Sequence, residues 1–249
     1  MASRSAIRQA VILAAGTGSR LRQNEQDLPK PLHVVAQMTL IERTLRTLAQ
    51  AGVDRFVVVV GFMAEAIRQA VQEMPFVDAS LSLTFVHNAD FQKSNGVSLV
   101  RARAALDGPS LLSMSDHVYD AALPCLAAQA DMSAADLYLC VDRRLDEIYD
   151  MDDATKVKTR DDAIVKIGKQ LTDFDCIDTG VFAVAPRLVD MLAELEQQKG
   201  DFSFSEGVAA LAARGRARVL DIGEAFWQDV DTPGALARAE SILGGASGR

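Results

Sequence analysis

The sequence is poor in the features that mark several classes of protein. Its 249 residues include one tryptophan, three tyrosines and three cysteines. Cys125, Cys140 and Cys176 are odd in number and widely spaced, so we predict neither a disulfide framework nor a zinc knuckle. No segment approaches the roughly 18 to 20 consecutive apolar residues that a membrane-spanning helix needs. We therefore expect a globular chain without a membrane span.

The charge balance argues against a nucleic-acid partner. The chain carries 34 acidic and 26 basic residues, a net charge of −8, and no dense Lys/Arg block. Nucleic-acid binders depend on neutralising many backbone phosphates, whereas a few local cations suffice for one nucleotide triphosphate. The first apolar run leads into a glycine loop and not into a small-residue cleavage site, which predicts a cytoplasmic protein.

Alternating strand and helix patterns predict the fold class. Short apolar runs, typical of strands buried on both faces, occur at residues 10–13, 56–60, 83–86 and 110–114. Helical patterns lie between them at residues 40–49, 64–74 and 97–106, the first with a capping box formed by Thr39 and Glu42. This alternation predicts a mostly parallel, Rossmann-like mixed sheet in a three-layer α/β/α arrangement.

The second half is less regular, and we interpret it as additions around the same sheet. Residues 155–169 predict a hairpin that turns at residues 160–162. A strand at residues 178–185 should end at Pro186, which opens a helix, and Ser203 with Glu206 offers a second capping box. We find no internal repeat or linker. The chain is therefore predicted to be a single domain over residues 1–249, with a core at 6–243 and a flexible tail at 244–249.

The stretch that follows the first strand, VILAAGTGSRLRQNEQDLPKPL, is suited to phosphate. It is not a P-loop, because the pattern G-x-x-x-x-G-K-[ST] is absent, and it is not the dinucleotide fingerprint, because Arg20–Leu21 stands in place of the third glycine. Gly16 and Gly18 would let backbone N–H groups approach phosphate oxygens, and Arg20 and Lys30 would hold the outer and the attacked phosphate. The alternative is a flexible turn with solvated cations.

Three aspartates are candidate metal ligands. Asp116, in SMSDHVYD, follows a buried strand, and its carboxylate would be a suitable ligand for Mg²⁺. Asp229 and Asp231, in FWQDVDTP, alternate and would share one face of a strand. Asp231 is our first choice for the second ligand and Asp229 our second. The alternatives are helix-capping roles for these aspartates, and His117 is expected to be a supporting or turn residue.

The motif LAAGTGSRL…PKPL resembles the nucleotidyltransferase superfamily with the L-A-A-G-x-G-[TS]-R…P-K pattern, which implies the nucleotide-diphospho-sugar transferase type of fold. In that family the loop HNADFQKSNGVSL lies beside the base, although Asn-Gly can also be a simple turn before a helix. The nucleotide-binding residues that the resemblance implies are Leu13, Ala14, Ala15, Gly16, Thr17, Gly18, Ser19, Arg20, Lys30, Asn88, Asn95, Gly96 and Ser98.

Four further segments, MSDHVYD, ATKVK, IVKIGKQLTDFDCIDTGVF and WQDVDTP, look like the CTP:inositol-1-phosphate cytidylyltransferase family. The likeness extends from Ala10 to about Leu243. It implies an acceptor pocket, although exposed hairpin lysines are often only solvated. The implied acceptor-binding residues are Lys156, Lys158, Lys169, Asp178, Thr179 and Gly180.

The resemblance implies transfer of CMP from CTP to inositol 1-phosphate, with release of pyrophosphate, by a Mg²⁺-dependent enzyme. Arg20, Lys30 and Asp116 are the expected catalytic residues. Members of that family are often fused to a membrane-embedded transferase, so we expect either a free-standing enzyme or one domain of a longer protein. A homodimer is left open. The alternatives are another acceptor (phosphocholine, an aminoalkyl phosphonate, glycerol phosphate or a sugar phosphate) and a non-catalytic nucleotide-binding protein.

Overall fold

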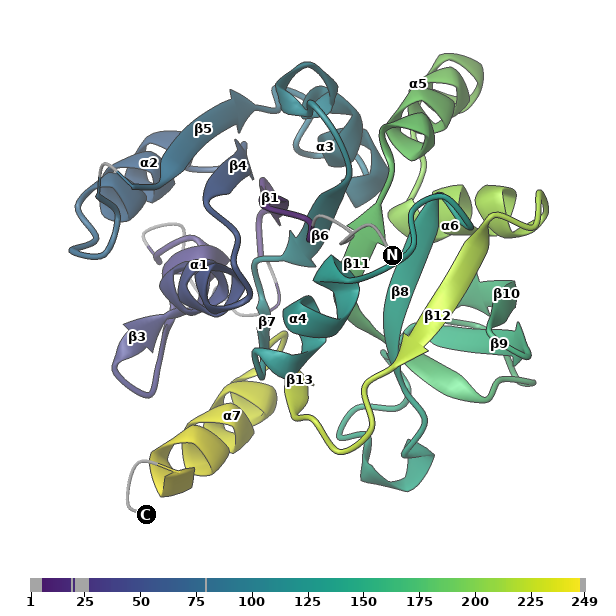
Figure 1. Ribbon diagram of the computed structural model, residues 1–249. Helices are drawn as coiled ribbons and strands as arrows, with labels where there is room; N and C mark the ends of the chain where they lie inside the picture. The colour runs from purple at the N-terminus through teal and green to yellow at the C-terminus, as the bar shows by residue number, and fades with distance from the viewer. Residues whose placement is uncertain (1–5, 19, 21–26, 79, 247–249) are drawn as a thin grey trace.

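The computed structural model describes residues 6–18, 20, 27–78 and 80–246 (Figure 1). Within these ranges the centre of the molecule is a nine-stranded sheet in the order β5-β4-β1-β6-β11-β8-β12-β10-β9. Its strands are β1 (Gln9–Ala14), β4 (Arg55–Val60), β5 (Ser82–His87), β6 (Ser110–Met114), β8 (Leu137–Asp142), β9 (Lys156–Arg160), β10 (Ala163–Gly168), β11 (Cys176–Val184) and β12 (Ala217–Asp221).

Two small antiparallel sheets and a set of helices surround this sheet. The small sheets pair β2 (Val34–Val35) with β3 (Met38–Thr39) and β7 (His117–Tyr119) with β13 (Trp227–Asp229). The α-helices are α1 (Leu40–Gln50), α2 (Ala64–Gln72), α3 (Asn95–Arg101), α4 (Ala122–Ala128), α5 (Pro186–Lys199), α6 (Phe204–Ala212) and α7 (Pro233–Ala246). The short 3₁₀ helices are η1 (Lys30–Leu32), η2 (Arg103–Ala105) and η3 (Leu145–Glu147).

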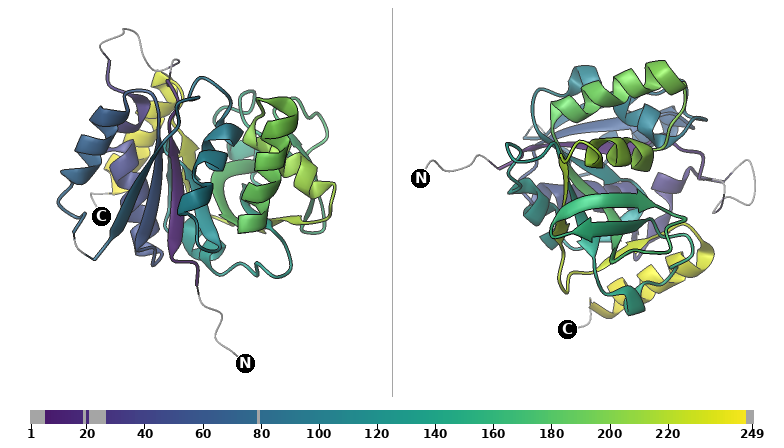
Figure 2. Two further views of the ribbon diagram at one scale, coloured as in Figure 1. Left: turned by 90° about the horizontal axis from the view of Figure 1, so that it is seen from above. Right: turned by 90° about the vertical axis from the view of Figure 1, so that its right-hand side faces the viewer.

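The sheet has helices on both faces, which confirms the predicted three-layer arrangement. Alternate residues of β1 point to opposite sides of the sheet, as the strand period requires. Val11 packs in an apolar cluster with α3, α5 and α6, whereas Ile12 packs in another cluster with α1, α2 and α4. Figure 2 shows the sheet between these two groups of helices. In a third, smaller apolar cluster, α7 packs against α1.

The first four strands of the sheet order are parallel, as predicted. β1 pairs in parallel with β4 and β6, and β4 pairs in parallel with β5. The predicted strands at residues 10–13 and 83–86 each extend one residue further at both ends. Because parallel strands end at one edge, the loops that follow β1 and β6 meet there.

The second half of the sheet is mixed. β11 lies between β6 and β8 and is antiparallel to both, while β8 and β12 are parallel. β11 begins at Cys176, before the predicted start at residue 178, and β8 has no counterpart among the predicted strands. The register of β11 shifts between Asp178 and Phe182, where Gly180 has a φ of +77°. This irregularity brings the backbone of Gly180 close to β7.

The predicted caps and the hairpin are largely present. Ser203 and Glu206 form the full capping box of α6. Thr39 accepts a hydrogen bond from the Glu42 amide, but the Glu42 carboxylate turns to Arg46, so that box is half formed. β9 and β10 form the predicted hairpin. The helix predicted at residues 97–106 begins two residues earlier and ends at Arg101, where η2 follows closely.

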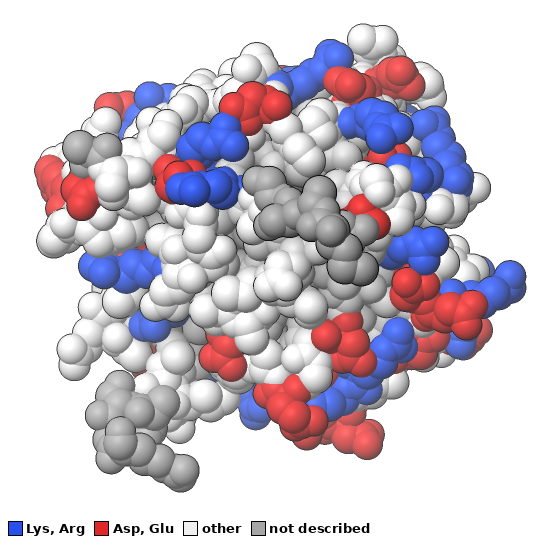
Figure 3. All heavy atoms as spheres, viewed as in Figure 1, with Lys and Arg blue, Asp and Glu red and all other residues white. Residues whose placement is uncertain are grey.

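α7 continues to Ala246, into the stretch predicted as a flexible tail, and residues 247–249 lie outside the described ranges. No helix in the described ranges combines the length and the hydropathy of a membrane span. On the face drawn in Figure 3, acidic and basic side chains are interspersed. That face therefore presents no continuous basic surface of the kind that binds nucleic acid.

Candidate active site

Two adjoining cavities open where the loops after β1 and β6 meet. The first cavity has a volume of about 290 Å³ and is lined by residues 13–18 and by the start of α3. The second cavity, of about 360 Å³, extends from this point over β11, β13 and α7. The side chains that line both cavities are Arg20, Asn95, Met114, Asp116 and Asp231. Two molecules bound in these cavities would therefore meet at this shared wall.

The glycine loop lines the first cavity. A Cβ atom at Gly16 would meet nothing within 4 Å, so its backbone faces open space. Ser19 lies outside the described residues. The predicted nucleotide-binding residues that line the first cavity are Leu13, Ala14, Ala15, Gly16, Thr17, Gly18, Arg20, Lys30, Asn95 and Ser98.

Residue 18 must be a glycine because Lys30 leaves no room for a side chain there. Its φ is +60°, and a Cβ atom there would lie 2.5 Å from Cβ of Lys30. Lys30 opens η1 between Pro29 and Pro31, whose fixed φ angles shape this turn. The glycine thus lets the loop close directly over the lysine.

The Lys30 ammonium group is buried among three carboxylates at the wall between the cavities. Its side chain is 7% exposed, and Nζ lies 2.7 Å from Asp116 Oδ2, in contact with Asp231, and 3.8 Å from Asp229 Oδ1. Burial would lower the pKa of Lys30, but the carboxylates outweigh it and hold that pKa above its ordinary value. Burial would likewise raise the pKa of Asp116, but the Lys30 charge holds it well below its usual range. The lysine therefore stays charged at neutral pH.

Asp229 differs from its neighbours because its Oδ1 atom is buried and forms no hydrogen bond. Burial raises the pKa of this carboxyl to about 6. In contrast, the oxygens of Asp231 are engaged by Lys30 and Arg20. A buried carboxylate oxygen that accepts no hydrogen bond is costly unless a cation binds it closely. Asp229 is thus better placed than Asp231, our first choice from the sequence, to complete a cation site with Asp116.

The residues present fit a magnesium ion. Ligand atoms of Asp116, His117 and Asp229 lie within 4.8 Å of one another, and so do those of Asp153, Asp229 and Asp231. Both groups include Asp229, and carboxylate oxygens are the ligands that Mg²⁺ prefers.

Arg20 forms ion pairs at the wall between the cavities. Its guanidinium contacts Asp231, and Nη1 lies 2.6 Å from Asp153 Oδ2. Asp153 also accepts a hydrogen bond of 2.7 Å from Lys169 Nζ. Arg20 remains half-exposed, so a phosphate group in either cavity can replace its carboxylate partners.

The structure separates the six predicted acceptor-binding residues. Lys169, Asp178 and Gly180 line the second cavity. The others lie elsewhere: Lys156 Nζ donates to the Asp152 carbonyl, Lys158 pairs with Asp173, and the buried Thr179 hydroxyl donates to the Cys140 carbonyl. The alternation that places Lys156 and Lys158 on one face of β9 is present, but that face does not reach the cavity.

Two of the residues predicted beside the base support the first cavity without lining it. Asn88 is fully buried and donates to the Ser98 hydroxyl, which does line the cavity. A Cβ at Gly96 would lie 2.5 Å from the Phe202 ring, so this glycine lets α3 pack closely. Asn95 accepts a hydrogen bond from the Phe204 amide and thereby ties α3 to the start of α6.

Sequence reasoning missed several residues around the cavities. Phe91 and Lys93 line the first cavity, and Asp153, Arg144 and Arg238 line the second. The acidic run DMDD before TKVK was the available signal for Asp153. The Arg144 and Arg238 positions carry no such signal, because single arginines in a loop and in a helix are usually solvated.

Several known proteins are similar to this chain in sequence or in structure. Residues 10–214 match the MobA-like NTP transferase domain. The bifunctional IPC transferase and DIPP synthase of Thermococcus kodakarensis is 35% identical over 94% of this chain and 50% of its own length. The CMP-5'-(3-aminopropyl)phosphonate synthase of Streptomyces rubellomurinus is 32% identical over 93% of this chain and 38% of its own length.

A solved structure shows that the likeness extends to the whole fold. The inositol-1-phosphate CTP transferase from T. maritima has a TM-score of 0.85 and 27% sequence identity, with 96% of each chain covered. The chain spans about half or less of the length of the two curated relatives, but nearly all of this solved chain. The resemblance inferred from the sequence motifs is confirmed, and the chain belongs to the MobA-like NTP transferase domain family.

Proposed function

We propose that this chain is a Mg²⁺-dependent cytidylyltransferase that transfers CMP from CTP to inositol 1-phosphate. Its products are CDP-inositol and pyrophosphate. The single observation that carries the proposal is the buried Lys30, which lines the first cavity and contacts Asp116 and Asp231 in the wall shared by both cavities. The named activity of the T. maritima structure, which covers nearly the whole chain, supports the choice of CTP and of the acceptor.

The first cavity is assigned to CTP. The exposed backbone at Gly16 and the closed turn at Gly18 suit the triphosphate, and Ser98 and Asn95 at the start of α3 suit the nucleoside. With CTP bound in this way, the α-phosphate would lie near Lys30 and the β- and γ-phosphates along the loop. Arg20 would leave Asp153 to hold the departing pyrophosphate.

The chemical step is an in-line substitution at the α-phosphorus of CTP. A phosphate oxygen of the acceptor forms the new P–O bond, and the bond to pyrophosphate breaks on the opposite side. The attacking oxygen already carries negative charge, so no strong general base is needed. Lys30 stabilises the charge that develops on the α-phosphoryl oxygens, and the two cavities align the reacting groups.

Asp116 and Asp229 are the residues that would hold Mg²⁺, with Asp231 and Asp153 close by. When bound there, the ion neutralises phosphate charge at the point where both substrates meet. The uncoordinated Oδ1 of Asp229 supports this assignment.

The second cavity is assigned to the acceptor. Asp178 lies in its wall, and burial raises the pKa of this carboxyl to about 6. One of its oxygens accepts from the Gly180 amide, which leaves the other to accept from an inositol hydroxyl. Lys169 would hold the acceptor phosphate once that phosphate displaces Asp153. The cytoplasmic location remains a prediction from the sequence. A homodimer remains open.

An aminoalkyl phosphonate is the second candidate acceptor. The relative from Streptomyces rubellomurinus makes, by its name, CMP-5'-(3-aminopropyl)phosphonate. The second cavity has a surplus of acidic side chains, among them Glu147, Asp150 and Glu224, and aromatic walls at Trp227 and Tyr149. Such surroundings can bind an ammonium group.

Pyrophosphate release with CTP and Mg²⁺ tests the proposal. The acceptor panel contains inositol 1-phosphate, 3-aminopropylphosphonate, phosphocholine, glycerol phosphate and glucose 1-phosphate, each with UTP as a control nucleotide. We expect release with CTP and inositol 1-phosphate above all other combinations. Greater release with another acceptor would retain the reaction and replace the substrate. CTP binding without release on any acceptor would favour the non-catalytic alternative.

A further inference from the structure

His117 lies between the two aspartates best placed to bind a cation. It follows Asp116 in the chain, and it is the residue directly opposite Asp229 in the β7–β13 pair. Its Nδ1 atom lies 2.9 Å from Asp116 Oδ1 and 3.9 Å from Asp229 Oδ1. One ring nitrogen therefore faces both carboxylates, which come from segments more than one hundred residues apart.

The imidazole ring is fixed on two sides. It stacks on Trp227, with ring centroids 6.1 Å apart and planes inclined by 14°. Gly180 lies against it so closely that a Cβ there would be 2.6 Å from His117 Cδ2. Trp227 is fixed in turn, because its Nε1 atom donates a 2.8 Å hydrogen bond to Asp142, a carboxylate that Arg144 also binds. The ring has little freedom to turn away from Asp116.

The donor in the hydrogen bond between His117 and Asp116 follows from the chemistry of the two groups. An ionised carboxylate only accepts hydrogen bonds, so Nδ1 of His117 donates its proton to Asp116 and is not itself a ligand of the cation. The other oxygen of Asp116 accepts from Lys30 at 2.7 Å. Two fixed donors thus set the plane of this carboxylate, and each binds a different oxygen. Comparable partners of metal-binding side chains elsewhere change metal affinity about 10- to 100-fold when they are lost.

We propose that His117 is a positioning residue that holds Asp116 and Asp229 in the geometry of a divalent cation site. Its contribution to catalysis rests on the proposed cytidylyltransferase function, whereas its effect on cation affinity does not. The simpler explanation is that His117 only fills space between Trp227 and Gly180. The two explanations differ in whether the N–H group or the ring is needed.

Three substitutions separate the two explanations. His117→Phe keeps a planar ring against Trp227 and Gly180 but cannot donate to Asp116. His117→Asn places an amide N–H near the position of Nδ1, and His117→Gln places it near Nε2 instead. His87→Phe is the matched control, because His87 is an exposed histidine at the end of β5.

The measurement is Mn²⁺ affinity, from the electron paramagnetic resonance signal of free Mn²⁺, without nucleotide or acceptor. We expect His117→Phe to weaken Mn²⁺ binding at least tenfold and His117→Asn to stay within about threefold of the wild type. The sole tryptophan, Trp227, stacks on this ring, so its fluorescence shows whether each variant keeps the local fold. His87→Phe should bind Mn²⁺ like the wild type.

The proposal is overturned if His117→Phe binds Mn²⁺ as tightly as the wild type. It is also overturned if the Phe and Asn variants lose affinity equally, because the ring and not the N–H group would then matter. If His117→Phe does not fold, the Asn and Gln variants decide: tight binding by Asn and weak binding by Gln supports the proposal, and the reverse order contradicts it. A wild type that binds Mn²⁺ but releases no pyrophosphate would refute the proposed function alone.

Discussion

Lys30 Nζ lies 2.7 Å from Asp116 Oδ2, although the two residues are 86 positions apart in the chain. The contact joins η1, which the glycine loop covers, to the turn after β6. It exists because β1 and β6 are parallel neighbours and both end at this edge. Strand order in the sheet thus creates the charge cluster on which the proposed chemistry depends.

Lys30→Met should lower kcat at least about 100-fold and change the KM for CTP much less, because the lysine acts on charge that develops in the transition state. Steady-state kinetics with CTP and inositol 1-phosphate measure both constants. Lys166→Met, at an exposed position of β10, is the control. A Lys30→Met enzyme with the kcat of the wild type would refute this assignment.

Asp229→Asn should raise the Mg²⁺ concentration for half-maximal rate about tenfold or more. The reason is the buried Oδ1 atom of Asp229, which accepts no hydrogen bond and lies 3.8 Å from Lys30 Nζ. Asp231→Asn should change this concentration less, because the Asp231 oxygens already form ion pairs with Lys30 and Arg20. Mg²⁺ titrations of the two variants measure the difference. If Asp231→Asn has the larger effect, Asp231 is the ligand and our order is wrong.

Two glycines in one loop should respond differently to alanine. Gly18→Ala combines a φ of +60° with a contact of 2.5 Å to Lys30, so we expect a loss of about 1 to 3 kcal/mol in the free energy of unfolding. Gly16→Ala meets no protein atom within 4 Å. It should keep the stability of the wild type and raise the KM for CTP, because its methyl group points into space assigned to phosphate.

Urea unfolding and steady-state kinetics of the two alanine variants give these quantities. Equal stability of the Gly18→Ala variant and the wild type would show that the loop can move away from Lys30. An unchanged KM for CTP in Gly16→Ala would remove that residue from the proposed phosphate site.

Asp178 should make the stability of the protein depend on pH. Burial raises its folded-state pKa to about 6, so the folded protein binds this proton more tightly than the unfolded chain. The free energy of unfolding that it contributes is therefore greatest at low pH and falls as pH rises from about 4 through about 6. Asp178→Asn removes this penalty and retains an oxygen that can accept from the Gly180 amide.

Urea unfolding of both proteins at pH 4.5 and pH 7.5 tests this expectation. The Asn variant should gain stability relative to the wild type at pH 7.5, by about 1 to 3 kcal/mol, and less at pH 4.5. Comparing the two proteins cancels what unaltered groups contribute. A difference that is the same at both pH values would mean that Asp178 titrates normally.

The first half of the fold could be predicted because its signals are local. Short apolar runs, the helical periodicity of residues 40–49 and the capping residue Thr39 each report on their own segment. β8 carries the same local signal in the apolar run LYLCV but was not predicted, whereas the antiparallel insertion of β11 has no local signal. A strand's neighbours depend on long-range pairing, and an apolar run such as Leu137–Asp142 does not encode which strands will flank it.

Candidate site residues were predictable where a motif places them near the end of a strand. Arg20, Lys30 and Asp116 do meet at one wall. The sequence pattern could not order Asp229 and Asp231, because alternation puts both on one face and only the partners of each oxygen distinguish them. Lys156 and Lys158 looked equivalent to Lys169 in sequence, yet the hairpin directs them elsewhere.

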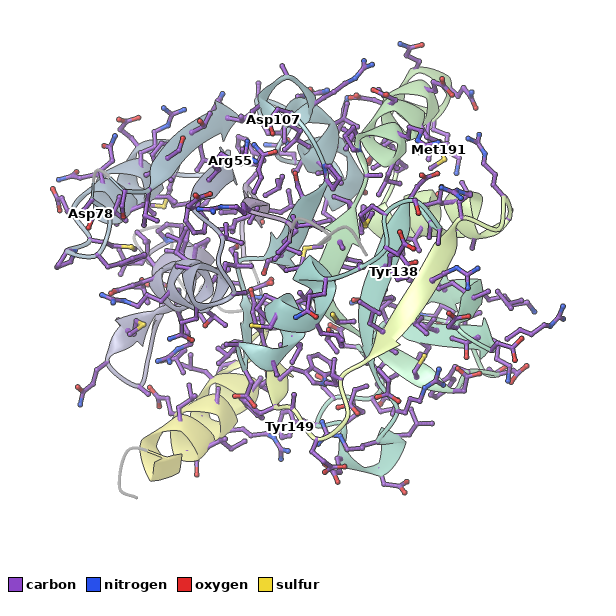
Figure 4. The ribbon with its side chains drawn as sticks, viewed as in Figure 1. Arg55, Asp78, Asp107, Tyr138, Tyr149 and Met191 are labelled. Carbon is purple, nitrogen blue, oxygen red and sulfur yellow. The ribbon has the colours of Figure 1, made fainter. Side chains whose placement is uncertain are left out.

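The outer boundary of the second cavity also depends on a contact between residues far apart in the sequence. Tyr149, labelled in Figure 4, lies beside α7, where its hydroxyl packs against Gly234 and Arg238 covers its ring at 5.2 Å. Tyr149 and α7 are separated by more than eighty residues, so nothing local in the sequence links them.

The most direct test of the account follows oxygen atoms through the reaction. The acceptor is inositol 1-phosphate labelled with ¹⁸O in its non-bridging phosphate oxygens. It is incubated with CTP, Mg²⁺ and the enzyme, and mass spectrometry gives the masses of the products. Attack by the acceptor phosphate predicts that all the label appears in CDP-inositol and none in pyrophosphate. Label in pyrophosphate, or pyrophosphate formed without CDP-inositol, would contradict the proposed reaction.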